Sequence, residues 1–498
     1  MKDYPEQAHL DRARAAFQSI WGYEDFRPPQ GEIIHSLLSG KDALIIMPTG
    51  GGKSICFQLP ALLQTGLTLV VSPLVALMEN QVQELRERYL PAGLIHSQLP
   101  AQQRKKTLQQ IQQNQLRLLY LSPETLLSKP VWESISQPQI QINGLILDEA
   151  HCLVQWGETF RPAYQRLGTV RSTLLKSKPM GSKIAVAAFT ATADHQTQQT
   201  IQKVLQLQKP EKFLLNPYRE NLNLRVQIVW TPRGRRQQLL KFINARKKQA
   251  GLIYVRTRKD SESLAAWLED EDYITAAYHA GLSAEERREI EKAWLNGDIQ
   301  FVVCTSAFGM GINKSNVRWV VHFQAPLLLS EYIQEVGRAG RDGKPAEALT
   351  LISEPTGWLY PEDKQRREFF EDKLRSQYQT AQKLAKKLPL QGDVEAISRK
   401  FPEGAIALSV LHSSGQLNWR DPFNYSINKS ARSLSGEQLN RTAAQQMSQY
   451  LTTRQCRWQF LLQAFGFEEA AKSLRCGHCD NCKKSYSNRQ GGLRGARG

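Results

Sequence analysis

A glycine-rich turn that ends in lysine and serine is the first feature of this sequence with recognisable chemistry. Residues 43–47 predict a buried strand before the turn, and residues 55–63 predict a helix after it. Glycines allow successive backbone N–H groups to point at phosphate oxygens, and the N-terminus of the helix attracts the same anion. A lysine at this place reaches the β- and γ-phosphates, and a serine hydroxyl binds Mg²⁺. The predicted nucleotide loop comprises Pro48, Thr49, Gly50, Gly51, Gly52, Lys53 and Ser54.

An acidic pair after another apolar run could complete the nucleotide site. Residues 144–147 predict a strand, so Asp148 and Glu149 lie at its carboxyl end, where open parallel sheets bind ligands. Asp148 can hold Mg²⁺, directly or through water, and Glu149 can polarise the water that attacks the terminal phosphate. An acidic pair alone is more often a helix N-cap. Together with the glycine-rich turn, the pair predicts nucleotide hydrolysis.

Four of the seven cysteines gather near the end of the chain, between positions 456 and 482. In a long chain such clustering favours a metal site over disulfides. Four thiolates form a closed tetrahedral Zn²⁺ site, which is structural because no coordination position is left for water. His478, in the same segment, is an alternative ligand. The predicted zinc ligands are Cys456, Cys476, Cys479 and Cys482.

The elements that must position these residues alternate between short apolar runs and longer amphipathic stretches. This alternation predicts covered parallel sheets with crossover helices. The first set of predicted strands is 43–47, 67–72, 116–122, 145–148 and 184–190. The second set is 251–255, 276–279, 301–305, 319–323 and 348–352. The two sets separate near residues 216–223, which predicts two α/β domains with a cleft between them.

The composition favours a polyanion as the partner. The 498 residues carry 65 Lys and Arg against 47 Asp and Glu, which gives a formal net charge of +18. Nucleic acid is the first expectation and an anionic membrane surface the second. A basic surface that only aids solubility is the alternative. No run of about 18 apolar residues predicts a transmembrane helix, and the N-terminus lacks the apolar segment of a secretory signal.

Residues 148–151, Asp-Glu-Ala-His, together with the glycine-rich turn, resemble superfamily 2 helicases. Further segments, in the family's order, resemble the RecQ family of ATP-dependent DNA helicases over residues 10–355, and the resemblance resumes at the cysteine cluster. It implies two RecA-like motor domains with ATP between them, and a zinc site with all four ligands on cysteine. The other matching segments are 22–30, 72–74, 122–125, 189–193, 278–282, 307–314 and 332–343.

The resemblance also assigns roles around the nucleotide. A tyrosine can stack on adenine while a glutamine amide matches its edge. An arginine finger from the second domain can be worth about 10³–10⁵ in rate. The adenine contacts implied are Tyr23, Arg27 and Gln30, and the coupling residues are His151, Thr190 and Thr192. The catalytic residues implied are Glu149, Lys53, Gln334, Arg338 and Arg341.

An aromatic-rich segment after the acidic motif resembles the loop with which RecQ helicases sense DNA. Trp156 and Phe160 can stack on unpaired bases, and Arg161 can pair with a phosphate. The alternative is that the two aromatics are core residues. Glu158 stands where we expect histidine in the bacterial pattern, so no DNA role is assigned to it. The other strand contacts expected are Ser72, Pro73, Ser122, Arg258 and His279.

The segment between the second domain and the cysteines is longer than we expect in short bacterial members. Residues 394–400 and 405–412 predict a helix–turn–helix pair and residues 416–427 a hairpin, which resembles a winged helix. Trp419 and Phe423 would face the duplex junction if the hairpin separates strands; the slightly favoured alternative is that both pack the core of the module. Sixteen residues follow Cys482, so no winged helix or HRDC domain is expected after the zinc site.

The fold class expected is α/β: two RecA-like parallel-sheet motor domains, then a small α+β winged-helix-like insert and a helical zinc module with four cysteine ligands. The expected motor domains are 1–217, which binds ATP, and 218–354. The linker and insert occupy 355–437, the zinc module 438–483, and a flexible basic tail 484–498.

These features predict an ATP-dependent DNA helicase in DNA repair and recombination, with the 3′→5′ polarity implied by the resemblance. The expected cofactors are ATP, Mg²⁺ and structural Zn²⁺. We expect a cytoplasmic, nucleoid-associated monomer that binds single-stranded, duplex and forked DNA and no membrane, with single-strand-binding or repair proteins as further partners. An RNA helicase is disfavoured by the aromatic segment and the zinc cluster. An annealing protein with weak turnover is disfavoured by the complete nucleotide site.

Overall fold

The structure is a computed structural model, and it describes residues 4–48, 50–155, 161–246, 248–308, 314–354, 356–428 and 445–484. The chain divides into two compact units, and each unit combines two segments that are distant in sequence. The first unit is Met1–Leu215 with Leu374–Glu437, and the second is Asn216–Lys373 with Gln438–Gly498. The predicted basic tail lies, apart from Lys484, outside the described residues.

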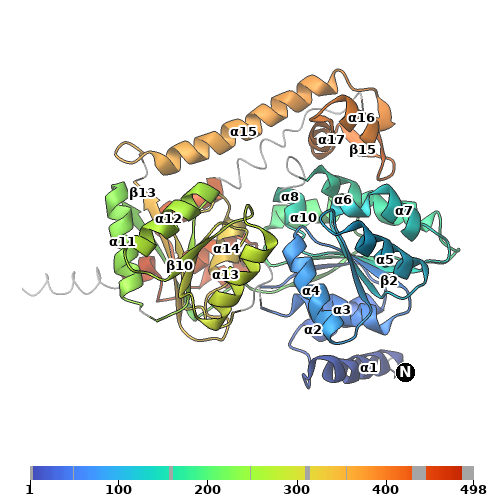
Figure 1. Cartoon of the computed structure of the whole chain (residues 1–498), viewed down its shortest axis with the longest axis horizontal. Coiled ribbons are helices and arrows are strands. Elements are labelled where there is room, and N and C mark those ends of the chain that lie inside the picture. The colour runs from blue at the N-terminus through green and yellow to red at the C-terminus, as the bar shows by residue number, and fades with distance from the viewer. Residues whose placement is uncertain are drawn as a thin grey trace, which may run out of the picture. The chain divides into compact units, whose positions relative to one another are not determined.

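The first unit is built on a parallel sheet with the strand order β3-β4-β2-β5-β6-β1-β7, and Figure 1 shows helices around its strands. Neighbouring residues of a strand point to opposite faces, so Leu44 lies in one hydrophobic core and Ile45 in another. The strands are β1 (Ala43–Ile46), β2 (Leu67–Val71), β3 (Ala92–Ile95), β4 (Leu118–Leu121), β5 (Ile142–Leu147), β6 (Ala185–Thr190) and β7 (Glu211–Leu214).

Helices cover this sheet, as the crossover connections of parallel strands require. They are α1 (Tyr4–Trp21), α2 (Gln30–Leu38), α3 (Lys53–Leu63), α4 (Val75–Glu87), α5 (Ala101–Gln112), α6 (Pro123–Leu126), α7 (Lys129–Ile135), α8 (Cys152–Gln155), the 3₁₀ helix η1 (Pro162–Thr169), α9 (Val170–Leu175) and α10 (His195–Val204).

The second unit contains another parallel sheet, with the order β10-β11-β9-β12-β13-β8. Its strands are β8 (Leu222–Val229), β9 (Gly251–Tyr254), β10 (Thr275–Tyr278), β11 (Phe301–Cys304), β12 (Trp319–His322) and β13 (Ala346–Ser353). Its helices are α11 (Pro232–Asn244), α12 (Arg258–Asp270), α13 (Ala284–Asn296) and α14 (Leu329–Val336). The expected pair of parallel-sheet domains is therefore confirmed.

Three strands of the two motor-domain sheets were absent from the sequence prediction, and all three lie at sheet edges. These are β3 and β7 at the two ends of the first sheet, and β8 at one end of the second. β8 alternates between buried and more exposed positions, β7 alternates between half-buried and exposed ones, and β3 is buried but contains Gly93. An edge strand has fewer buried neighbours, so its apolar signal is weaker than that of a central strand.

Residues 374–428, called the insert below, have the topology of a winged helix. The second half of α15 (Glu362–Ala385) is followed by β14 (Gln391–Asp393), α16 (Val394–Lys400), α17 (Gly404–Ser413), β15 (Leu417–Trp419) and β16 (Asn424–Ile427). The three strands form an antiparallel sheet in the order β14-β16-β15. The predicted helix pair and hairpin are thus confirmed. The insert follows the second motor domain in sequence but belongs to the first unit.

Residues 445–484, called the zinc module below, pack on the second sheet. The module contains α19 (Arg457–Ala464) and α20 (Glu468–Lys472), and its apolar side chains share a core with that sheet. The Trp458 indole Nε1–H donates to the carbonyl of Leu222 at 3.0 Å, so the module contacts the edge strand β8. Among the described residues, no helix has the length and apolar character needed to span a membrane.

Candidate functional site

The glycine-rich turn is a tight loop between β1 and α3. Gly50 and Gly52 have φ angles of 86° and 81°, in the left-handed region that favours glycine. Gly52 caps the N-terminus of α3, so backbone N–H groups and the positive end of the helix face one place. The Lys53 ammonium donates to the carbonyl of Met47 at 3.2 Å. The loop therefore has the form of an anion cradle. Thr49 lies outside the described residues.

The predicted adenine motif lies against this loop. The Gln30 side-chain Nε2 donates to the carbonyl of Gly51 at 3.0 Å, and its Oε1 accepts from the backbone of Arg27. Any side chain at position 52 would collide with Gln30, because a Cβ there would lie 2.3 Å from Nε2. Tyr23 is 52% exposed, and the centroid of its ring lies 5.4 Å from that of Phe17. Base recognition by these residues stays a prediction.

The acidic pair lies at the end of β5, as expected. Asp148 is buried, and its carboxylate accepts from the backbone N–H of Glu149 at 3.0 Å and from Gln81 at 3.4 Å. Burial raises the pKa of Asp148, and the neighbouring charge of Glu149 raises it further, whereas Lys53 lowers it. Glu149 has a φ of 49°, a left-handed conformation that costs about 1–2 kcal/mol for a residue with a side chain. Such strain clusters at active sites.

A divalent cation fits this edge of the sheet. Asp148 and Ser54 offer oxygen ligands, which Mg²⁺ prefers. A buried carboxylate beside a second carboxylate carries an electrostatic cost that a cation relieves. Lys53 follows β1 and its charge acts on Asp148, which places the two groups in one electrostatic site. The residues therefore fit magnesium: Asp148 and Ser54 would hold the ion, which would neutralise negative charge on the phosphates.

A polar chain connects the acidic pair to the next strand. The His151 Nδ1 lies 3.3 Å from a carboxylate oxygen of Glu149 and 2.9 Å from the hydroxyl of Thr190, at the end of β6. That hydroxyl donates to the carbonyl of Thr192, so it must accept from His151. His151 is thus protonated on Nδ1. Its Nε2 lies 3.5 Å from the Cys152 thiol, which burial keeps protonated by raising its pKa.

The expected strand contacts of the first domain differ in exposure. Ser72 and Pro73 are buried, whereas Ser122 is half-buried and caps α6 by accepting from the backbone of Thr125 at 3.2 Å. Arg161 has a guanidinium nitrogen 3.9 Å from the carboxylate of Glu124, on α6. Two of the expected contact segments are therefore linked. Trp156 and Phe160, with Glu158 between them, lie outside the described residues.

The arginine motif of the second domain is held by a buried ion pair. Arg256 donates from two nitrogens to Glu335 at 3.1 and 2.8 Å, and the His322 Nε2 lies 3.0 Å from the same carboxylate. Glu335 is on α14, which ends just before Arg338. Burial of Arg341 lowers its pKa to about 10, helped by the charge of Arg338. The guanidinium of Arg341 remains charged at neutral pH, as a finger role requires.

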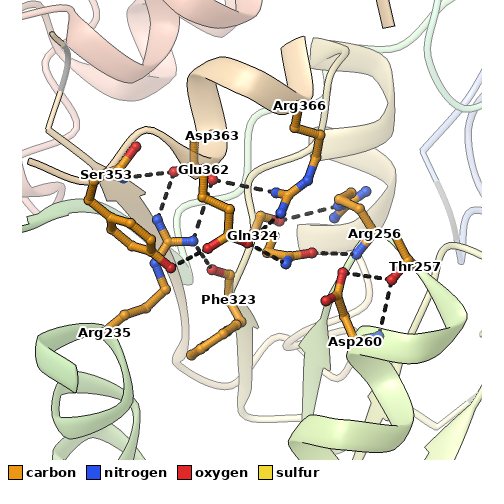
Figure 2. Close-up of polar contacts among 11 residues, drawn as sticks. Arg235, Arg256, Thr257, Asp260, Phe323, Gln324, Ser353, Glu362, Asp363 and Arg366 are labelled. Atoms are coloured by element: carbon orange, nitrogen blue, oxygen red, sulfur yellow. Dashed lines mark hydrogen bonds and ion pairs between the residues drawn. The ribbon is translucent and has the colours of Figure 1, made fainter. Parts of the chain in front are cut away.

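Figure 2 shows that this network extends to the start of α15. The Gln324 side chain accepts from the backbone of Arg256 and donates to Glu362 at 3.0 Å. Arg235 is fully buried and donates to Asp363 at 2.7 Å. The first turn of α15 is therefore fixed to the second motor domain by charged groups.

Two other expected DNA contacts, Arg258 and His279, lie next to Gly281. The His279 Nδ1 accepts from the backbone N–H of Gly281, and its Nε2 lies 2.8 Å from Glu262. A Cβ on Gly281 would lie 2.8 Å from the guanidinium of Arg258. Arg258 and His279 therefore lie close to the same glycine, although Arg258 is exposed and His279 is buried. Gln334 is half-buried on α14, and residues 309–313 of the matching segment lie outside the described part of the chain.

The four predicted zinc ligands converge. The sulfur atoms of Cys456, Cys476, Cys479 and Cys482 all lie within 4.8 Å of one another. Backbone N–H groups point at the sulfurs, for instance from Cys479 to Cys476 at 3.3 Å. Gly477 supplies a φ of 75° in the turn. Soft thiolates in such a closed set fit structural zinc. Among the described residues, His478 is not part of the cluster.

The two aromatic residues of the insert, Trp419 and Phe423, pack in different places. Trp419 packs in the core of the insert, with its ring 5.9 Å from that of His412. Phe423 instead contacts Trp132 of α7, edge to face, with centroids 5.1 Å apart. Packing in the module's core is thus confirmed for Trp419 and wrong for Phe423, which packs on the first motor domain. Both side chains are partly buried by these contacts.

Sequence reasoning missed the residues that support these sites. Gln81 holds Asp148, and the pair of Arg256 and Glu335 holds α14. The available signal was a polar side chain on an otherwise apolar helical face, which Gln81 provides. Arg256 and Glu335 are far apart in sequence, so no pattern could pair them.

Three family profiles match successive parts of the chain. Residues 27–201 match DEAD/DEAH box helicase, residues 234–343 match helicase conserved C-terminal domain, and residues 422–483 match RecQ zinc-binding. The profiles cover the nucleotide loop, the arginine motif and the four cysteines.

Curated relatives align over most of the chain. An ATP-dependent DNA helicase RecQ of Synechocystis sp. is 53% identical over 94% of this chain and 97% of its own length. An ATP-dependent DNA helicase RecQ of Haemophilus influenzae is 39% identical over 70% of this chain and 54% of its own length.

Solved structures share the architecture at low identity. The DEAD-box helicase Mss116 bound to ssRNA and UDP-BeF aligns with a TM-score of 0.58 at 20% identity, over 69% of this chain and 73% of that one. The Mycobacterium smegmatis helicase Lhr bound to ssDNA and AMP-PNP aligns with a TM-score of 0.56 at 20% identity, over 87% and 61%. These alignments support the fold of two RecA-like domains.

The helicase profiles, the zinc-binding profile and a relative that aligns along nearly its whole length point to the same assignment. The geometry agrees, because a phosphate cradle, an acidic pair and a cysteine cluster occupy the expected places. The chain belongs to the RecQ family of ATP-dependent DNA helicases.

Proposed function

We propose that this protein unwinds duplex and forked DNA by moving 3′→5′ along one strand, in DNA repair and recombination. The polarity and the biological role follow from the family resemblance. The observation that carries the proposal is the continuous polar chain from Glu149 through His151 to Thr190. It connects the hydrolytic carboxylate with the next strand, so that DNA and ATP can influence each other.

Within the nucleotide site, each residue has a separate task. Lys53 stabilises negative charge on the terminal phosphate, and the backbone N–H groups of the loop orient that phosphate. Glu149 accepts a proton from the attacking water. Burial lowers the pKa of His151, so the ring is neutral and donates from Nδ1. The neutral ring lies 3.3 Å from the Glu149 carboxylate and adds no positive charge that would reduce the ability of Glu149 to accept a proton.

The second domain is proposed to contribute the charge that completes hydrolysis. Arg338 and Arg341, with Gln334 on the preceding helix, are the candidates for contacting the β- and γ-phosphates. Positive charge there stabilises the transferring group. Since these residues belong to the second unit, the rate of hydrolysis would depend on the relative position of the two motor domains.

Strand contacts are proposed for Ser72, Pro73, Ser122, Trp156, Phe160, Arg161, Arg258 and His279. The net charge of +18 supports phosphate binding and predicts an affinity that falls steeply with salt. We place the protein in the cytoplasm, at the nucleoid, as a monomer. Single-strand-binding and repair proteins are the proposed partners.

Unwinding of tailed duplexes tests the proposal. Wild-type protein should separate a duplex with a 3′ single-stranded tail and leave one with a 5′ tail intact. Lys53→Ala should abolish ATP hydrolysis stimulated by DNA, because phosphate charge is then unbalanced, whereas Lys105→Ala, at an exposed position of α5, should not. Equal unwinding from both tails would contradict the polarity. Stronger stimulation by RNA than by DNA would favour an RNA helicase.

A further inference from the structure

The insert uses, for contact with its own chain, the surfaces that winged helices usually offer to DNA. The second helix of a helix–turn–helix pair normally reads the major groove. Here that helix is α17, which contains no Lys or Arg and packs against η1 of the first motor domain. The wing also turns inward, since Pro422 at its tip is buried. A module built to read DNA would leave both surfaces open and basic.

The docking contacts are specific. The Arg166 guanidinium donates to the carbonyl of Pro422 at 3.2 Å, and the His412 Nδ1 lies 3.1 Å from the side-chain oxygen of Gln165, which is 3% exposed. The ring of Phe423 packs edge to face on Trp132 and joins the core of the first motor domain. Polar bonds and an aromatic contact together fix the orientation of the insert, which an apolar patch alone would not.

The elements under the insert contain none of the expected strand contacts but follow two of them closely in sequence. Residues 162–169 form η1 and follow Arg161 directly, and α7 follows the segment that contains Ser122. The 3₁₀ helix η1 also packs closely on α10, where a Cβ on Gly168 would lie 1.9 Å from the carbonyl of Val204. The insert and α10 therefore both pack on η1.

We propose that the insert is a positioning module for DNA: by docking on α7 and η1, it holds Ser122 and Arg161 in the geometry that binds a DNA strand. Phe423, Pro422 and His412 are positioning residues, since they act through the elements they contact. The inference rests on the proposed function, in which DNA stimulates ATP hydrolysis. It assigns the wing a task other than strand separation.

The first test measures how ATP hydrolysis responds to oligo-dT in wild type, Phe423→Ala, Trp132→Ala and the double variant. The oligo-dT concentration for half-maximal stimulation should rise about threefold to tenfold in each single variant. The double variant should be no worse than the worse single variant, because both changes remove one contact. The rate without DNA and the KM for ATP should not change, since neither residue lies near the nucleotide loop.

Controls separate positioning from general damage. Phe369→Ala, at a 71% exposed position of α15, should match wild type in every measurement. Phe423→Leu keeps an apolar side chain in the dock and should restore most of the response to DNA. Hydrogen exchange of residues 161–169 in the full-length chain should be faster in Phe423→Ala, and oligo-dT should slow it in wild type more than in the variant.

Each contrary result has a distinct meaning. An unchanged half-maximal oligo-dT concentration in Phe423→Ala overturns the proposal, as does a parallel rise in the KM for ATP. Lost unwinding with an unchanged response to oligo-dT would also overturn it and assign strand separation to the wing. If Phe423→Ala unfolds, Phe423→Leu and the exchange measurement decide. Absence of any stimulation in wild type would instead contradict the proposed function.

Discussion

The insert and the zinc module are consecutive in sequence, yet each belongs to a different motor domain. The insert packs with the first unit and the zinc module with the second. The zinc module joins the edge strand β8: the Asp480 carboxylate accepts from the backbone of Val226, and Trp458 donates to Leu222. The insert joins helical surfaces through side chains. The zinc module thus extends the hydrophobic core of the second unit, whereas the insert covers part of the surface of the first motor domain.

The two modules therefore differ in how strongly each depends on the motor domain that it contacts. The zinc module shares one continuous hydrophobic core with its sheet, so removing it would expose buried strands. The insert has a core of its own around Leu408 and Tyr425, and meets the motor domain through a few contacts. A module with its own core can undock without unfolding. We therefore expect the zinc module to control stability and the insert to control the response to DNA.

The largest effect is expected from loss of a zinc ligand. Cys479→Ser should give a chain that loses zinc and fails to fold soundly, because apparent zinc-binding energies of about 10–16 kcal/mol in small zinc domains are folding energies. Zinc content and thermal unfolding check this, with His478→Ala, in the same loop, as the control that keeps the metal. A stable, active, zinc-free Cys479→Ser protein would contradict the assignment.

The next effect concerns the buried ion pair of the zinc module. Arg457 donates to Asp480 at 2.9 Å, and both side chains are buried. Arg457→Met should lower the free energy of unfolding by about 3–5 kcal/mol, because it leaves a buried carboxylate without its partner. Denaturant titration measures this. Arg399→Met breaks an exposed pair with Glu395 and should cost under about 1 kcal/mol. An equal loss of unfolding free energy in the two variants would contradict the expected difference between the buried and the exposed ion pair.

A smaller effect is expected where the insert docks. Phe423 and Trp132 should show a coupling energy of about 0.5–1.5 kcal/mol in a double-mutant cycle of unfolding, as edge-to-face aromatic pairs do. Zinc content should stay unchanged, since the two modules stabilise different units. A coupling energy near zero would mean that the two rings meet without stabilising the dock.

An effect of similar size is expected from a change of pH. Burial lowers the pKa of His412 to about 4, and the charge of Lys203 lowers it further, so the fold prefers the neutral ring. This contribution is present above the unfolded pKa of about 6.5 and is lost as pH falls toward 4. By pH 5.5 the loss should reach about 1 kcal/mol. Melting temperatures of wild type and His412→Gln at pH 7.5 and 5.5 check this, and the variant should lose less.

Much of the site chemistry could be read from residue types and spacing. The nucleotide loop, the acidic pair and the cysteine cluster are local patterns, in which a few neighbouring residues determine both backbone and ligand. Central strands were recognised because they are buried on both faces. Edge strands such as β8 were missed, since Asn223, Arg225 and Gln227 interrupt its apolar residues and its place depends on the strand that it pairs with.

Tertiary contacts decided the rest. The pairing of Arg256 with Glu335 and the protonation of His151 on Nδ1 depend on residues distant in sequence. The winged-helix pattern of the insert was local and predictable, but its place on α7 and η1 was not, because docking depends on the shape and charge of a surface assembled elsewhere. Local patterns specify elements and ligands, whereas the choice between competing surfaces is made only when the whole chain has folded.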